Sequence, residues 1–453
     1  EWHDNEINLN TENSQFKKTD YNQKVKYNKN SIIQDFQKKI DEYQPDIIFW
    51  SALSSHIHGE GEYINIEYGY DLIKNAKIKK AIKICGGIQT THDPESVYKK
   101  FKNIDYFISG ESEKILLEVA KSIDDEKKIK SLNGINFFDK KKSIFVKNKS
   151  QEIIQNLDEI SPYDYEIFNK NVFLRPYNGK VLNAVDFEIS RGCIYTCSYC
   201  VETIIQKYYG FKEYNKNGTL LNFKKYLRNK SAQVVYDELK NLNKNLNISL
   251  FRMQDTNFLT IDRNMLLDLS ELLQKNPLNI KLYIETRAEG INDKTIELLK
   301  NLNVDGVGMG LELSDESFRQ TKLNRFVNQE KIENAFKLLK KNNINRTAYN
   351  IIGLPDQNEQ SIIETIKFNI KLAPDVSSVA YYSKYDGTDL TKLAKNNFEK
   401  NTRGMDAQIR SKIINHNIDS TTLEFYKMNF NILIKNKLKG LEKLKSVWLD
   451  KLS

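Results

Sequence analysis

The chain has 453 residues, of which 40% are hydrophobic and 11% aromatic, so its length and composition predict a globular protein of several domains. No uncharged apolar run approaches the roughly 20 residues of a membrane span, so we expect no transmembrane helix and no membrane partner. The formal charge of +9 comes from 69 Lys and Arg residues spread along the whole chain, which argues against a nucleic-acid partner. Only four cysteines are present, which favours the reducing cytoplasm.

The N-terminal part of the chain predicts a tail followed by an alternating α/β unit. Residues 1–30 are polar and lack a steady periodicity, which is typical of an irregular tail. From residue 31 to 123, short apolar runs alternate with amphipathic stretches. The expected strands are 45–51, 81–85 and 104–108, and the expected helices are 31–40, 69–78, 94–102 and 112–123. This alternation predicts a doubly wound, Rossmann-like parallel sheet.

Small or polar residues follow each of these expected strands. Ser51 follows the first strand, Gly86 and Gly87 the second, and Gly110 and Glu111 the third. Ligands of a parallel sheet bind outside the carboxyl ends of its strands, and glycine lets the backbone approach a ligand closely. We therefore expect these five residues to contact a bulky ligand.

Three further segments complete the expected domain organisation. Residues 124–175 contain two apolar runs around a lysine-rich turn, which predicts a hairpin that links two domains. Residues 176–395 repeat strand, loop and helix six times, which predicts a partial (β/α)6 barrel of the TIM type, with its chemistry at the carboxyl ends of the strands. Residues 396–453 are basic, with leucines at helical spacing, and we expect a C-terminal helical cap. The six expected barrel strands are 182–190, 248–254, 280–286, 304–309, 345–352 and 377–383.

The cysteine array is the strongest chemical signal in the chain. Cys193, Cys197 and Cys200 form a CxxxCxxC pattern directly after the first expected barrel strand. Three converging thiolates suit a [4Fe–4S] cluster with one iron left open. A zinc site usually closes with a fourth Cys or His nearby, and a disulfide framework needs paired cysteines in a small secreted chain. Neither alternative fits as well, and the remaining Cys85 reads as a small apolar strand-end residue.

This array, with the aromatic Tyr199 before its last cysteine, resembles that of the radical S-adenosylmethionine (SAM) enzymes. The resemblance implies that a reduced [4Fe–4S] cluster chelates SAM, cleaves its carbon–sulfur bond and releases a 5′-deoxyadenosyl radical that abstracts hydrogen from the substrate. It also implies an external electron donor such as flavodoxin or ferredoxin.

The same resemblance assigns residues at the barrel rim to SAM. Asp255 follows the second barrel strand, where an acid can accept hydrogen bonds from the methionine ammonium. Arg287 follows the third and could pair with the methionine carboxylate, and Glu312 follows the fourth, near the ribose or amino group. Tyr199 could shield the adenine and the cluster from water, and Gly353, in a Gly-Leu-Pro segment, marks a backbone contact with the adenine. An ordinary ion pair at the rim is the alternative for each charged residue.

The order of strand-end residues over 31–123 is similar to the cobalamin-binding domain of cobalamin-dependent radical SAM enzymes. That domain normally opens with one more strand and helix than this sequence supplies, so we expect a shortened version of it. His56 and His58 follow the first strand and could ligate a metal, but two histidines in a hydrophilic loop are usually solvated.

Together these resemblances imply methylation of an unactivated carbon in a small-molecule or peptide substrate, with methylcobalamin as the methyl donor. Two alternatives remain open at this point. The chain could catalyse a radical cyclisation or rearrangement without cobalamin, or it could be a non-catalytic iron–sulfur or cobalamin-binding sensor.

Overall fold

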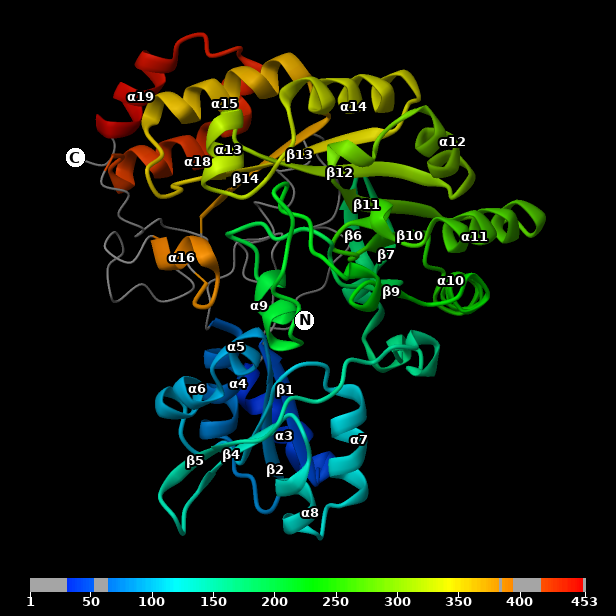
Figure 1. The fold of residues 1–453 in the computed structure, drawn as a ribbon, viewed down its shortest axis with the longest axis vertical. Helices are drawn as coiled ribbons and strands as arrows, with labels where there is room; N and C mark the ends of the chain where they lie inside the picture. The colour runs from blue at the N-terminus through cyan, green and yellow to red at the C-terminus, as the bar shows by residue number, and fades with distance from the viewer. Residues whose placement is uncertain (1–30, 53–63, 383–384, 394–416, 451–453) are drawn as a thin grey trace.

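The computed structural model of the chain describes residues 31–52, 64–382, 385–393 and 417–450. Figure 1 shows an N-terminal domain below a larger curved sheet with its own helices. The boundary between the two parts is formed by helices α5 (Ile88–His92) and α9 (Glu202–Tyr208), which pack against each other. The predicted α/β fold class, with a Rossmann-like unit followed by a partial barrel, is confirmed.

The N-terminal sheet has five strands in sequential order. They are β1 (Ile47–Ala52), β2 (Ile82–Gly87), β3 (Tyr106–Ile108), β4 (Ile135–Asp139) and β5 (Ile144–Lys147). The first three strands are parallel, as predicted, but β4 and β5 add an antiparallel hairpin to the edge of the sheet. The hairpin assigned to a linker over 124–175 therefore belongs to this sheet, because Phe107 and Ile108 of β3 pair with Asn136 and Ile135 of β4.

Helices cover both faces of this sheet because its strand residues alternate in direction. They are α3 (Ile32–Tyr43), α4 (Ile64–Asn75), α5, α6 (Pro94–Lys100), α7 (Glu113–Lys121) and α8 (Glu126–Ser131). Ile84 and Ile108 pack with apolar residues of α7 and α8 on one face. Cys85 and Phe107 pack with residues of α4 and α6 on the other, so Cys85 is a core residue, as expected.

The second sheet contains the six predicted barrel strands in one parallel array. These are β7 (Lys180–Phe187), β10 (Leu250–Met253), β11 (Lys281–Thr286), β12 (Val304–Glu312), β13 (Asn345–Ile352) and β14 (Val376–Tyr381). A further strand that the sequence did not indicate, β6 (Leu174–Tyr177), pairs antiparallel with β7 at the edge. The sheet is curled but open, which is the partial barrel expected from six repeats.

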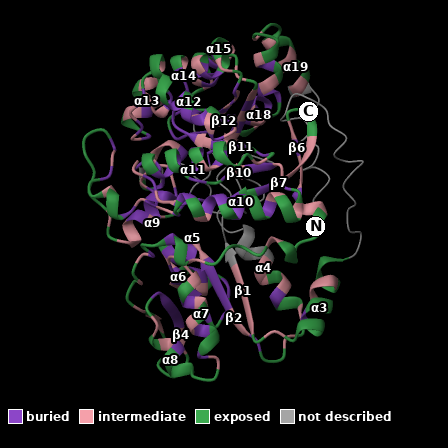
Figure 2. Cartoon of the chain, turned by 90° about the vertical axis from the view of Figure 1, so that its right-hand side faces the viewer, coloured by how far each residue is buried: buried purple, intermediate pink, exposed green. Residues whose placement is uncertain are grey.

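Amphipathic helices cover the outer face of this sheet, with their buried sides toward the strands and their exposed sides outward (Figure 2). They are α10 (Ala232–Leu246), α11 (Arg263–Lys275), α12 (Asp293–Asn301), α14 (Gln329–Lys341) and α15 (Glu359–Leu372). The short helices α13 (Glu316–Thr321) and α16 (Asp389–Leu393) instead contribute to an apolar cluster that includes Leu313 and Tyr199. Since the apolar residues of the strands point outward to these helices, the polar strand residues remain for the concave side. No helix in the part of the chain that the structure describes is long and apolar enough to cross a membrane.

The C-terminal segment forms two helices, α18 (Ser420–Lys435) and α19 (Leu441–Asp450). The predicted helical stripe is interrupted at Lys437 and Leu438, which both have positive φ angles. Leu423 and Phe430 of α18 pack with Val379 and other outward residues of β14. The described part of the expected cap thus forms an additional outer layer over the last barrel strand.

Candidate functional site

The three cysteines lie in one loop that starts where β7 ends and continues into α9. Other segments hold its backbone: Thr196 N–H donates to Gly218 O at 3.0 Å, and Ser198 N–H donates to Leu323 O at 3.0 Å. Cys193 and Cys197 are buried and Cys200 is half-buried. All four cysteines of the chain are free, which contradicts a disulfide framework.

The surroundings of the sulfurs fit a positively charged metal group. Burial, assisted by the nearby carboxylate of Glu202, raises the pKa of Cys193 to about 12. Burial and the neighbouring Cys197 raise the pKa of the Cys200 thiol well above its usual value. Thiolates are the forms that bind iron, so a bound cationic cluster is what would stabilise them here. The described residues contain no group of three or more Cys, His, Asp or Glu side chains placed to hold a metal ion, so the binding of a cluster by the three cysteines stays a prediction.

Two polar groups frame Cys197, and both include predicted site residues. Arg287 lies with its guanidinium 3.7 Å from the ring centroid of Tyr195 and its Nη1 3.7 Å from Sγ of Cys197. Its Nε donates to Glu289 Oε1 at 3.0 Å. Arg287 therefore places a positive charge beside the sulfur of Cys197.

The second group joins Tyr199 to Glu312. The Tyr199 hydroxyl donates to Glu312 Oε1 at 2.7 Å, and Arg325 Nη1 lies 3.7 Å from the same oxygen. Burial and the charge of Glu312 raise the pKa of Tyr199 well above its usual value, so this phenol stays protonated. The structure thus brings Cys197, Tyr199, Arg287 and Glu312 into one neighbourhood, as predicted.

The backbone conformation at Glu312 is unusual, and it explains why residue 310, two positions earlier, is a glycine. Glu312 has a φ of 62°, and the pairing of β12 with β13 shifts between Gly310 and Glu312. A Cβ at Gly310 would lie 2.3 Å from Oε1 of Glu312. Glycine therefore makes room for a carboxylate that is turned back over its own strand.

Sequence reasoning missed Arg325, which the structure places beside Glu312. It is 4% exposed, and its Nη2 donates to Gly310 O at 2.5 Å. Arg325 follows a short helix rather than a barrel strand, so its position in the repeat carried no signal. An arginine among apolar residues was the one available hint.

Asp255 lies at the start of the cysteine loop, where it contacts Ile189 and Ser190. Its Oδ1 accepts hydrogen bonds from Ser190 N–H at 2.6 Å and from Ser190 Oγ at 2.5 Å. Burial raises the pKa of Asp255 to about 7. Its Oδ2 is buried and has no hydrogen-bond partner among the residues that the structure describes, so one carboxylate oxygen is left for a ligand.

Gly353 forms a turn that a neighbouring amide stabilises. Its φ is 76°, and its N–H donates to Gln357 Oε1 at 2.7 Å. Gln357 Oε1 also accepts the Leu354 N–H at 3.2 Å, so this side chain caps the turn. Leu354 shares an apolar cluster with Tyr199, which ties this turn to the cysteine loop.

A polar layer lines the concave side of the barrel, and sequence reasoning did not identify it. The Tyr283 and Tyr349 hydroxyls lie 2.8 Å apart, and Tyr349 donates to Glu285 Oε1 at 3.0 Å. A Cβ at Gly308 would lie 2.6 Å from the Tyr349 ring, so this glycine makes room for it. The alternating glycines of β12 were the sequence signal, because every second residue of a strand faces the same side.

The same layer continues across the neighbouring strands. Arg252 Nη1 lies 3.5 Å from Asp186 Oδ1, and Gln254 Nε2 donates to that oxygen at 2.9 Å. The side chain of Asp186 is 49% exposed and that of Arg252 is 24% exposed. Charged groups on the concave side are therefore accessible to a ligand.

The strand ends of the N-terminal sheet contain the other predicted residues. Ser51 is the register partner of Gly86 on adjacent parallel strands, and Gly87 has a φ of 110°. Gln89 follows directly in α5 and is 5% exposed, yet neither atom of its amide has a hydrogen-bond partner in the described ranges. A buried amide of this kind indicates a place for a polar ligand. His56 and His58 lie outside the described residues.

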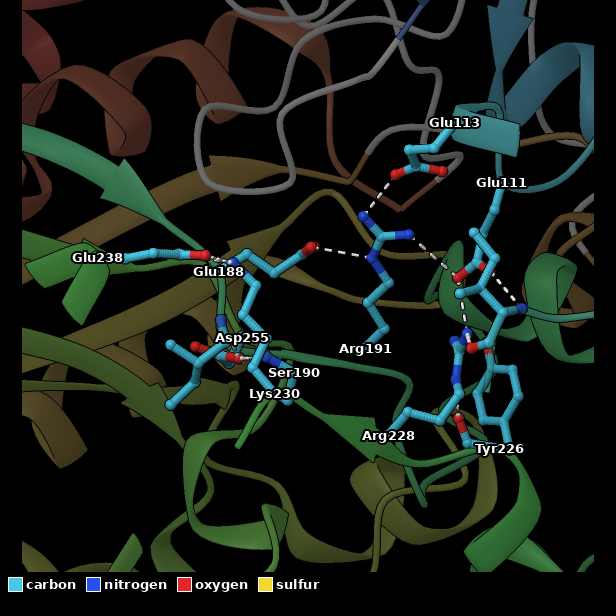
Figure 3. Close-up of polar contacts among 12 residues, drawn as sticks. Glu111, Glu113, Glu188, Ser190, Arg191, Tyr226, Arg228, Lys230, Glu238 and Asp255 are labelled. Atoms are coloured by element: carbon cyan, nitrogen blue, oxygen red, sulfur yellow. Dashed lines mark hydrogen bonds and ion pairs between the residues drawn. The ribbon is translucent and has the colours of Figure 1, made fainter. Parts of the chain in front are cut away.

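Gly110 and Glu111 contact the barrel domain. A Cβ at Gly110 would lie 2.6 Å from the hydroxyl of Tyr209, just past α9. The Glu111 carboxylate lies between Arg191 and Arg228, as Figure 3 shows. Contact of these two residues with a cofactor stays a prediction.

Comparisons with known proteins agree with this geometry. Residues 187–368 match the model of the radical SAM superfamily. An uncharacterized methyltransferase of Pyrococcus horikoshii is 26% identical over 80% of this chain and 72% of its own length. The anaerobic magnesium-protoporphyrin IX monomethyl ester cyclase of Rubrivivax gelatinosus is 25% identical over 78% of this chain, which spans 59% of that relative.

Solved structures share the two-part fold. The radical SAM methyltransferase TsrM from Kitasatospora setae, with cobalamin and a [4Fe–4S] cluster bound, superposes with a TM-score of 0.61 at 16% identity, covering 80% of this chain and 67% of TsrM. The cobalamin-dependent radical SAM enzyme OxsB gives a TM-score of 0.56 at 19% identity, covering 80% and 48%.

Proposed function

We propose that this chain is a radical SAM enzyme that methylates an unactivated carbon of its substrate with bound cobalamin, and the match of residues 187–368 to the radical SAM superfamily supports the first part of this proposal. The radical SAM domain implies a [4Fe–4S] cluster and SAM as cofactors. One observation carries the proposal: the strand ends of the N-terminal sheet pack directly on the cysteine loop. Ile88 of α5 shares an apolar cluster with Val201 and Ile204, which follow Cys200. A ligand at those strand ends would lie beside the cluster loop.

Cys193, Cys197 and Cys200 would hold the [4Fe–4S] cluster, which, when bound and reduced by an external donor, would supply the electron for cleavage of SAM. The chain's own residues bind and orient that substrate. Arg287, whose Nε and Nη2 are bonded to Glu289, has Nη1 beside Cys197 for the methionine carboxylate, and Asp255 has an unpartnered oxygen among the described residues for the ammonium. Glu312, fixed by Tyr199 and Arg325, faces the ribose or amino group. These roles place SAM between the cysteine loop and the strand ends.

Cobalamin, when bound, supplies the methyl group, and the N-terminal residues hold it in place. Gly87, with its positive φ, lets the backbone approach a large ligand, and the Gln89 amide supplies an unused donor and acceptor within the residues described. The missing side chain of the neighbouring Gly86 makes room for the Phe49 ring. The fold shared with TsrM and OxsB supports this assignment.

Substitution of one cysteine tests the proposal. After anaerobic reconstitution and reduction, the wild type should contain iron and sulfide and convert SAM to 5′-deoxyadenosine. Cys197→Ala should abolish 5′-deoxyadenosine formation, because it removes one of three cluster ligands. Cys85→Ala is the matched control, since Cys85 is buried in the N-terminal core and should leave the activity intact. Turnover that persists in Cys197→Ala would refute the proposal.

A second candidate is a radical cyclisation without cobalamin. The names of the cyclase relatives favour the cyclisation and carry no information on cobalamin. The visible spectrum of protein reconstituted with hydroxocobalamin separates the two. Corrinoid absorbance that survives gel filtration supports methyl transfer, and its absence with full SAM cleavage supports cyclisation. A non-catalytic sensor would bind its cofactor and cleave no SAM. An external electron donor and a small-molecule or peptide substrate are part of the proposal.

A further inference from the structure

A small ribbon beside the cysteine loop places two arginines opposite each other. Strand β8 (Ser190–Arg191) pairs antiparallel with β9 (Arg228–Asn229), and Arg191 is the register partner of Arg228. Like charges directly opposite in an antiparallel pair are destabilising. A carboxylate from the N-terminal domain offsets this repulsion: Glu111 Oε1 lies 2.8 Å from Nη1 of Arg228 and 3.4 Å from Nη1 of Arg191 (Figure 3).

This carboxylate is buried and held at both of its oxygens. The side chains of Glu111 and Arg228 are 12% and 5% exposed, and Glu111 Oε2 accepts the Ile154 N–H at 2.9 Å. Arg191 also contacts Glu113 at 2.6 Å and Glu188 at 2.9 Å. Removing one partner of a buried ion pair leaves an uncompensated charge, so these contacts are far stronger constraints than surface pairs.

The ribbon is tied to both ends of the cysteine loop. Arg191 lies two residues before the first cysteine, and a Cβ at the intervening Gly192 would lie 2.7 Å from the carbonyl oxygen of Tyr226. The Tyr226 hydroxyl donates to Glu202 Oε1 at 2.6 Å, two residues after the last cysteine. A change in the loop therefore reaches the ribbon directly.

Two tyrosines at the end of α9 form hydrogen bonds with the same segment of the N-terminal domain, residues 109–111. Tyr208 donates its hydroxyl hydrogen to Ser109 O at 2.9 Å, and the Tyr209 hydroxyl accepts the Glu111 N–H at 2.9 Å. Gly110 lies between these bonds, where any Cβ would collide with the Tyr209 hydroxyl. The loop after β3 is thus bonded both to the residues that precede the three cysteines and to those that follow them.

We propose that Glu111, Arg191 and Arg228 form a latch that couples order in the cysteine loop to order at the strand ends of the N-terminal sheet. The inference rests on the proposed function, because it takes the cysteine loop to hold a cluster. Assembly of the cluster stabilises residues 109–113 through the latch. A ligand at the strand ends stabilises the cysteine loop to the same extent, because coupling between two sites is reciprocal.

Hydrogen exchange of the full chain, cluster-free and anaerobically reconstituted, tests the latch. In the wild type, reconstitution should slow exchange about tenfold at 109–113 as well as at 193–209. In Glu111→Gln it should slow exchange at 193–209 only. The matched control is Glu159→Gln, which removes an exposed ion pair with Lys114 and should behave as the wild type does. If Glu111→Gln does not fold, Arg191→Lys takes its place in the test. Lysine keeps the positive charge of Arg191 but lacks its planar guanidinium.

Equal slowing of both segments in Glu111→Gln would overturn the latch. Iron content, measured on the same samples, separates this result from failure of the proposed function. If no cluster assembles, the proposed function fails, and the latch is then judged in the cluster-free proteins. In the cluster-free proteins, the latch predicts that Glu111→Gln speeds hydrogen exchange at both 109–113 and 190–193. An effect confined to 109–113 would overturn the latch.

Hydroxocobalamin provides the reciprocal measurement. We expect hydroxocobalamin to bind the reconstituted wild type about tenfold more tightly than the cluster-free wild type. It should bind the reconstituted and cluster-free forms of Glu111→Gln equally. Equal binding to both forms of the wild type would count against the latch. If hydroxocobalamin binds neither protein, the cobalamin assignment fails and the exchange data decide on the latch.

Discussion

The latch and the polar layer of the barrel use the same residue types in opposite ways. In the latch, Arg228 and Glu111 are 5% and 12% exposed, and both oxygens of Glu111 are bonded within the protein. In the polar layer, Arg252 and Asp186 are 24% and 49% exposed, and their contact is 3.5 Å long. Buried charges with complete partners fix one arrangement of two domains, whereas accessible charges can exchange their partners for a ligand. Burial therefore separates the structural arginine from the one that is available for binding.

The largest effect is expected from Arg228→Met. The substitution removes a buried partner of Glu111 and leaves the carbonyl oxygen of Ile154 without its donor, so we expect a loss of about 3 kcal/mol in the free energy of unfolding. Denaturant titration of the cluster-free protein measures it. Lys114→Met is the control, because it breaks an exposed pair and should cost under about 0.5 kcal/mol. Equal losses in both variants would contradict the distinction between buried and accessible charges.

A pH-dependent stability is the next largest effect, and it comes from Asp255. Its pKa is raised from 3.8 to about 7 by burial, so the folded protein holds a proton that the unfolded chain releases between these values. The stabilisation is complete below pH 4 and is lost as the pH rises toward 7, by up to about 3 kcal/mol. Asp255→Asn should flatten this part of the profile of unfolding free energy against pH. A slope that is unchanged in the variant would show that Asp255 is ionised throughout.

Tyr349→Phe sharpens the contrast from the side of the polar layer. The substitution removes the hydroxyl that bonds Glu285 and contacts Tyr283, so we expect a loss of only about 1 kcal/mol in stability. Because the layer faces the concave side, we expect a larger effect on substrate-dependent turnover than on 5′-deoxyadenosine formed without substrate. Proportional losses in both rates would indicate a purely structural role.

Asp186→Asn should produce the smallest change in stability. The side chain is 49% exposed, so its pair with Arg252 should contribute under about 0.5 kcal/mol, and thermal unfolding should be nearly that of the wild type. A clear loss of stability in Asp186→Asn would mean that Asp186 contributes to the fold as the buried charges of the latch do.

Local patterns accounted for the elements and for the cysteine loop. Apolar periodicity located all six parallel barrel strands, and the spacing of Cys193, Cys197 and Cys200 indicated their shared role before any fold was known. Position in the repeat also brought Arg287 and Glu312 to the rim near Cys197. These signals are short-range, because strand ends and motif spacing are written in consecutive residues.

Contacts between residues that lie far apart in the sequence had no such local signal. The sequence pattern alone determined that this chain alternates strands and helices in two units and that three closely spaced cysteines follow one strand. Only the tertiary structure decided that β4 joins the edge of the N-terminal sheet, that Arg325 supports Glu312, and that Glu111 lies between arginines 80 and 117 residues away. The physical reason is that hydrogen bonds and ion pairs between distant segments depend on how packed elements are placed, and local periodicity carries no record of that placement.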